Sequence, residues 1–161
     1  MKKLIKTLDK TEEVFLVLMF IAMVGIIFFQ VIMRFVFNNS LSWSEEFGKF
    51  LFVWISWIGI SIGHRRKEHI KITLLVEKLP YKIKKILEAL SEIVLIVISG
   101  ITLYYGVIMI GIQKKVPYAG IKISTSWGYL SLVLGTGLFI IRSVNILIEI
   151  IKEINRKDII I

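Results

Sequence analysis

Four long stretches without Asp, Glu, Lys or Arg constrain the fold of this chain more than any other feature, and they cover residues 14–33, 50–63, 93–113 and 123–141. Three of them contain 19–21 residues, which as α-helices would be about 30 Å long, the thickness of one hydrocarbon core. The second contains 14 residues but reaches 21 when it is counted from Trp43 to Gly63. Because unpaired backbone groups are costly in lipid, each stretch must be helical. The pattern predicts an all-α polytopic membrane protein with four transmembrane helices.

The composition is that of one membrane domain. Of the 161 residues, 56% are hydrophobic, whereas a soluble domain usually contains about 45–50%. No internal repeat and no low-complexity linker is evident. We therefore expect a single four-helix domain over residues 1–161, with spans that cover about 14–37, 43–63, 89–113 and 123–148.

The positive charges are distributed unevenly between alternate connecting segments. Sixteen of the 21 Lys and Arg residues lie before the first span, between the second and third spans, or at and after the end of the fourth, and five lie in the other two connections. The positive-inside rule then predicts that both termini and the long middle segment are cytoplasmic. The orientation of the chain in the bilayer explains the net charge of +9 better than nucleic-acid binding does. No nucleic-acid partner is expected, because no binding module is evident.

A basic segment connects the second and third spans. From Tyr81 to Leu90 apolar residues recur at helical spacing, and Pro80 stands where the first turn of a helix tolerates proline. We expect a helix that begins at the cytoplasmic surface and continues into the third span, preceded by an interfacial amphipathic segment over Ile70–Leu79. Five basic side chains are expected to contact membrane lipid headgroups: Arg65, Arg66, Lys82, Lys84 and Lys85.

Tryptophans and small residues predict helix contacts. Trp54 and Trp57 lie one turn apart in the second span, where a buried indole N–H needs a partner. Their face is expected to meet protein, either another helix of this chain or another subunit. Small residues four apart allow helices to approach closely, and the chain has two such pairs: Gly59 with Gly63, and Ser131 with Gly135.

Two adjacent acids, Glu45 and Glu46, stand at the outer start of the second span. Ser42 and Glu45 match a capping box, and negative charge is favoured at a helix N-terminus. Glu46 points about 100° away and could pair with Lys49 or Arg34. The alternative is that a partner protein binds the cluster, and we predict a partner interface made of six residues: Arg34, Trp43, Glu45, Glu46, Trp54 and Trp57.

The sequence predicts neither an enzyme nor a cofactor site. A charged residue inside a membrane span is the usual mark of an ion or proton path. The four uncharged stretches contain none, so we expect a charge-poor interior that braces a partner. His64 and His69 are the two histidines; we place them in the cytoplasmic segment, outside the membrane core, at headgroup level rather than as haem or metal ligands. There is no cysteine and no nucleophile–base set or phosphate-binding glycine loop. A small stand-alone four-helix transporter would need a membrane-embedded carboxylate, and the candidates lie at the rims: Glu45, Glu46 and Glu92.

A series of motifs in the first half of the chain points to one family. Gln30-x-x-x-Arg34 is followed by Asn38, Trp43-Ser44-Glu45-Glu46, Phe52-x-Trp54, Gly59, Arg65-Arg66, His69-Ile70 and Leu79-Pro80. In order and spacing they resemble the small membrane subunit of tripartite ATP-independent periplasmic (TRAP) transporters, the DctQ-like family. Beyond Pro80 the resemblance rests on helix count and length and on Tyr118 and Trp127-Gly-Tyr129. The family often has a proline near the start of the fourth span, and this chain has none there.

The resemblance implies a four-span subunit in the bacterial inner membrane with both termini cytoplasmic. It implies a large membrane subunit that carries the sodium and substrate sites and moves like an elevator. It also implies a soluble periplasmic substrate-binding protein that delivers an organic acid, such as a C4-dicarboxylate, a sugar acid or a sialic acid. The small subunit would extend the immobile scaffold and hold no cofactor of its own. A structural subunit of another membrane complex remains the alternative.

Overall fold

The computed structural model describes residues 2–65 and 80–158, with side chains from 10 to 64 and from 80 to 155. This part of the chain forms four α-helices: α1 (Lys2–Phe35), α2 (Ser42–Arg65), α4 (Tyr81–Gln113) and α5 (Ser126–Asp158). All four are long and apolar enough to cross a membrane. The predicted all-α fold with four transmembrane helices is confirmed, and the chain is a multi-pass membrane protein. The interfacial segment predicted over Ile70–Leu79 lies outside the described residues.

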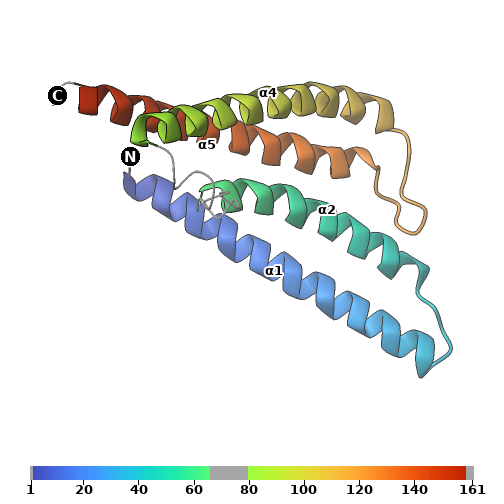
Figure 1. The fold of residues 1–161 in the computed structure, drawn as a ribbon. Helices are drawn as coiled ribbons and strands as arrows, with labels where there is room; N and C mark the ends of the chain where they lie inside the picture. Colours follow the sequence, from blue (N-terminus) through green and yellow to red (C-terminus); the bar gives the residue numbers. More distant parts are fainter. Residues whose placement is uncertain (1, 66–79, 159–161) are drawn as a thin grey trace.

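The helices form an open row in the order α1, α2, α5, α4 (Figure 1). Each helix packs on its neighbour in this row. In the most apolar part of α1 no residue is buried, whereas 33% of the corresponding part of α2 is buried. The two edge helices α1 and α4 therefore expose most of their apolar surface, and α2 and α5 form the packed centre.

The central helices meet along faces of small residues. Four serines on these two helices are fully buried: Ser44, Ser61, Ser131 and Ser143. Gly135 of α5 lies against the backbone of α2, because a Cβ atom at this position would stand 2.5 Å from the carbonyl oxygen of Trp57. A Cβ atom at Gly59 would stand 3.5 Å from the side chain of Leu16 of α1, whereas a Cβ atom at Gly63 would meet nothing within 4 Å. One glycine of each predicted pair thus lies at a helix contact, and Gly63 does not.

The last two helices are longer than the membrane core requires. Each contains 33 residues, which corresponds to about 50 Å, against about 30 Å for the hydrocarbon core. The helix predicted to begin near Tyr81 does begin there, directly after Pro80, whose φ is −54°. Beyond the core, Lys85 of α4 pairs with Glu153 of α5 at 2.7 Å. The α4–α5 contact therefore continues as an ionic one outside the most apolar region.

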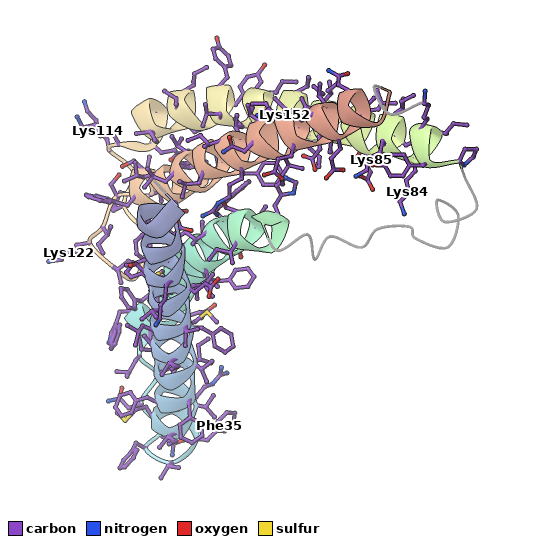
Figure 2. The ribbon with its side chains drawn as sticks, turned by 90° about the vertical axis from the view of Figure 1, so that its left-hand side faces the viewer. Phe35, Lys84, Lys85, Lys114, Lys122 and Lys152 are labelled. Carbon is purple, nitrogen blue, oxygen red and sulfur yellow. The ribbon has the colours of Figure 1, made fainter. Side chains whose placement is uncertain are left out.

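The row has two distinct ends (Figure 1). At one end, here called the terminal end, lie the start of α1 and the end of α5; at the other, the loop end, lie the connections 36–41 and 114–125. Figure 2 shows that α1 runs at a steep angle to α4 and α5, so that Phe35 lies far from Lys114 and Lys122. The α1 helix thus departs from the α4–α5 pair toward the loop end.

Candidate partner-binding site

The loop between α4 and α5 has a defined conformation at the loop end. An isolated antiparallel bridge joins Pro117 to Ser124, and the Tyr118 amide donates to the Ile123 carbonyl at 3.0 Å. The Ser124 hydroxyl donates to the carbonyl of Lys114 at 2.8 Å. These bonds close the loop on itself and give it a fixed shape.

The same loop lies against the start of α2. A Cβ atom on Gly120 would stand 2.6 Å from the Ser42 carbonyl oxygen, 3.0 Å from the Cα of Trp43 and 3.1 Å from the Cγ of Glu46. Distances this short to backbone atoms leave room only for glycine at this position. The chain itself therefore covers part of the predicted partner interface, at Trp43 and Glu46.

The two adjacent acids share one lysine. The Lys49 ammonium lies 3.1 Å from a carboxylate oxygen of Glu45 and 3.1 Å from one of Glu46. The Glu45 side chain is 64% exposed and that of Glu46 only 21%, in agreement with the loop that lies over Glu46. The predicted pairing of Glu46 with Lys49 is confirmed. Arg34 does not take part: its guanidinium carbon lies 5.8 Å from the ring centroid of Phe35.

The predicted capping box at the start of α2 is wrong. The helix already includes Ser42, so Leu41 takes the N-cap position. The Ser44 hydroxyl donates to the Leu41 carbonyl at 2.7 Å, and Glu45 pairs with Lys49 instead of returning to the backbone. Glu45 nevertheless lies in the first turn of α2, where the helix dipole favours a negative charge.

A line of aromatic rings runs along α2 from the loop end. The centroids of Trp43 and Phe47 are 6.5 Å apart, those of Phe47 and Phe50 are 6.1 Å apart, and those of Phe50 and Trp54 are 6.2 Å apart. Tyr118 of the α4–α5 loop packs edge-on against Phe50 at 6.0 Å. Burial raises the pKa of Tyr118 above its usual value, and a neighbouring carboxylate adds to the effect. The line thus anchors the loop to α2.

The six residues predicted as a partner interface differ in exposure. Arg34, Trp43 and Glu45 are exposed, and Glu46, Trp54 and Trp57 are half-buried. Trp57 contacts protein through its backbone, and the contacting helix is α5 of the same chain. The indole nitrogen of Trp54 is buried and has no hydrogen-bond partner in the described part of the chain. A partner at the loop end would therefore meet Trp43 and Glu45 first.

Sequence reasoning missed a second polar cluster, which lies toward the terminal end and includes residues from all four helices. Arg142 of α5 donates from Nη1 to the Ser61 hydroxyl of α2, and its Nη2 pairs with the Glu12 carboxylate of α1. The side chains of Arg142 and Glu12 are 14% and 22% exposed. One guanidinium thus connects α5 to both α1 and α2.

His64 makes the other half of this cluster. Its Nε2 lies 2.8 Å from the Ser143 hydroxyl of α5 and 3.2 Å from the Glu92 carboxylate of α4. Its ring centroid lies 4.3 Å from that of Phe139, and the residue is only 3% exposed. His64 lies on α2, which continues to Arg65, and not in the segment that connects the second and third spans.

The depth of the cluster explains how the membrane tolerates it. Glu92 lies 21 residues before Gln113, and His64 lies 22 residues after Ser42, so each is about 30 Å along its helix from the loop end. One hydrocarbon core is about as thick. His64 and Glu92 are therefore near the far boundary of a core of that thickness rather than at its centre. We call this set the terminal-end cluster: Glu12, Ser61, His64, Glu92, Arg142 and Ser143.

The basic side chains predicted at lipid headgroups are only partly described. Lys84 and Lys85 stand in the first turns of α4, at the end opposite Lys114 (Figure 2). Lys85 pairs with Glu88 at 3.0 Å and with Glu153. Lys82 is exposed in the same turns. The side chain of Arg65 and the whole of Arg66 lie outside the described residues, so their lipid contacts stay a prediction.

The arrangement offers packing and charge rather than chemistry. Among the residues described, no group of three or more His, Asp and Glu side chains could hold a metal ion. Two features could bind a partner: the exposed apolar faces of the edge helices α1 and α4, and the exposed side chains of Trp43 and Glu45 at the loop end. Both features are suited to binding and not to catalysis.

Comparison with known proteins gives a consistent result. Residues 23–153 match the family described as tripartite ATP-independent periplasmic transporters, DctQ component. The chain is 35% identical over 102 residues to the sialic acid TRAP transporter permease protein SiaT of Haemophilus influenzae; the match covers 63% of this chain but 17% of that protein. It is 29% identical over 135 residues to a putative TRAP transporter small permease protein of the same species, with 82% of this chain and 80% of that protein covered.

A third relative is similar over nearly its whole length. The sialic acid TRAP transporter small permease protein SiaQ of Vibrio cholerae is 28% identical over 157 residues, which cover 94% of this chain and 88% of the relative. The matched family consists of transporter permease subunits and not of enzymes. Because the family match covers most of the chain and reaches into all four helices, this chain belongs to the DctQ component family of TRAP transporters.

Proposed function

We propose that this chain is the small subunit of a sodium-coupled TRAP transporter that imports an organic acid, and that it braces a larger membrane subunit. Family membership supports the small-subunit role. Two relatives are named for sialic acid, which supports an organic acid as the substrate class. In this proposal sodium and the substrate bind the large subunit, and a periplasmic binding protein delivers the substrate.

The proposal of a large partner rests on the lengths of the relatives. The chain corresponds to only 17% of SiaT, whereas it corresponds to 80% and 88% of the two small permease proteins. A segment like this chain therefore occurs in one polypeptide with a much longer remainder. We infer that this chain binds a large membrane partner comparable to the rest of SiaT, either as a separate subunit or as a fused domain.

The bracing role rests on one structural observation, the open row of helices. α1 has no buried residue in its most apolar part and α4 has only 6%, so two wide apolar faces are available at the edges. A row with two free edges can present one edge to a partner and the other to lipid. A closed bundle would offer lipid and partner the same limited surface.

Co-purification tests the proposal most directly. The tagged chain, extracted with mild detergent from cells that contain its genomic neighbours, is expected to recover a much larger polytopic membrane protein. Vesicles that contain both proteins should take up an organic acid only when a sodium gradient and the binding protein are present. Sodium-driven uptake by this chain alone would instead support the stand-alone transporter.

A charge reversal at the loop end tests whether the binding protein docks there. Glu45→Lys changes an exposed carboxylate, so we expect unchanged folding but a threefold to tenfold lower rate of binding-protein-dependent uptake, roughly the effect of one unfavourable rim charge. Glu46 is less suitable because the α4–α5 loop covers it. Lys152→Glu, an exposed reversal near the terminal end, is the matched control. Equal uptake by both variants and the parent would remove Glu45 from the docking surface.

A further inference from the structure

Two side chains of the terminal-end cluster connect all four helices. Arg142 connects α5 to α1 through Glu12 and to α2 through Ser61. His64 connects α2 to α4 through Glu92 and to α5 through Ser143. Each of these pairs joins a helix of the α1–α2 pair to a helix of the α4–α5 pair, so the contacts form only when the two helix pairs are docked. We propose that the terminal-end cluster is a polar latch that sets the placement of the α1–α2 pair on the α4–α5 pair.

The physical reason lies in the solvent. Lipid tails are as apolar as leucine side chains, so apolar helix faces gain no hydrophobic free energy when they meet each other instead of lipid. The position of α1 shows this most clearly. Its packing against two glycines of α2 leaves room for a methyl group, because a Cβ atom at Gly59 or at Gly48 would stand 3.5 Å from the side chain of Leu16 or Ile27, an ordinary van der Waals distance. Such contacts can slide with little change in energy.

The polar contacts cannot slide in the same way. A shift of α1 along α2 by one turn would move Glu12 by about 5 Å and separate it from the guanidinium of Arg142. A shift of α2 on α5 would likewise separate His64 from Ser143. Each shift would leave a largely buried charge or hydrogen-bonding group without its partner, which is costly in an apolar environment. For α1 the cluster therefore selects one register out of several that packing alone would allow, and for α2 it adds to the close contact at Gly135.

The latch lies at one end of the row only. Toward the loop end, α1 departs from α4 and α5 (Figure 2), and Arg34 near the end of α1 contacts the neighbouring Phe35 rather than another helix. The free part of α1 therefore pivots about the latch if the latch is weakened. This inference concerns the chain by itself and does not rest on the proposed function.

Distance measurements by pulsed electron spin resonance test the proposal. The chain has no cysteine, so a label pair can be introduced cleanly at Ile21→Cys on α1 and Tyr104→Cys on α4, two exposed sites. In lipid nanodiscs, Arg142→Gln is expected to widen the distance distribution by about twofold or more, because α1 loses its register, while the helix content is unchanged. Lys152→Gln removes an exposed charge from the same helix and should leave the distribution as in the parent.

A second variant keeps the test decisive. If Arg142→Gln yields no folded protein, Glu12→Gln removes the same ion pair from the less buried side and should widen the α1–α4 distribution in the same way. Unchanged widths in the folded variants would overturn the latch. So would equal widening in Lys152→Gln, because the effect would then follow from the loss of any positive charge on α5.

Discussion

Gly135→Ala is expected to destabilise the folded chain by about 1–3 kcal/mol, although it adds a single methyl group. The new Cβ atom would stand 2.5 Å from the carbonyl oxygen of Trp57 and 2.7 Å from its carbonyl carbon. A flexible side chain could move away from such a contact, but the backbone of α2 cannot move without separating the two central helices. The free energy of unfolding in mixed detergent micelles, measured as a function of denaturing detergent, reports the change.

Gly100→Ala is the matched control for this substitution. Gly100 lies within α4, and a Cβ atom there would meet nothing within 4 Å. Alanine is favoured over glycine in a helix by roughly 0.5–1 kcal/mol, so this variant should be neutral or slightly more stable than the parent. If both variants lost the same amount of stability, the close approach of α2 and α5 at Gly135 would not be present in the membrane protein.

The apolar spans were the predictable part of the fold, because lipid demands one long uncharged helix for each crossing. The start of α4 near Tyr81 was also predictable, since Pro80 suits the first turn of a helix. The order of the helices in the row was not. Small residues occur often in apolar helices. The sequence alone therefore does not show that Gly135 packs closely against α2, whereas no atom lies within 4 Å of a Cβ atom built at Gly63.

At the loop end, local sequence information predicted local contacts. The pairing of Glu46 with Lys49 follows from a spacing of three residues on one helix, and the structure has it. The contact of Gly120 with the start of α2 could not be predicted in this way, because it depends on how a loop more than 70 residues away in the sequence folds against α2. The same limit applies to the capping box, which depends on a helix start that the sequence places only within a residue or two.

The terminal-end cluster was missed for a definite reason. The second span was ended at Gly63, where its uncharged stretch ends, and the fourth at about residue 148, whereas α2 continues to Arg65 and α5 to Asp158. His64 was therefore assigned to the connecting segment, and Arg142 was counted with the positive charges at the end of the fourth span, although each lies one residue beyond an uncharged stretch. A usable signal was present: Arg142 stands inside a helix that remains apolar on both sides of it, and a charge in that position needs a partner.

His64→Leu is expected to destabilise the chain by about 1–3 kcal/mol, the usual cost of leaving buried polar groups, here the Ser143 hydroxyl and the Glu92 carboxylate, without a partner. The leucine would keep the contact with Phe139, so the loss would report the polar contacts rather than packing. Among the described residues His64 is the ion-pair partner of Glu92, whose side chain is 13% exposed. His64→Gln, which retains an N–H donor, should lose less, about 1 kcal/mol. Unfolding in mixed micelles gives both values.

The double variant His64→Leu with Glu92→Leu separates the two explanations for such a loss. If the single variant is unstable because Glu92 is left as an unpaired charge, removal of that charge should restore most of the stability, since an apolar pair of similar volume is often as stable as a buried ion pair. If the loss came from the shape of the imidazole against Phe139 and Ser143, the second substitution would restore nothing. A single His64→Leu variant as stable as the parent would mean that His64 does not hold α2 against α4. The α1–α2 pair would then depend on Arg142 alone for its register.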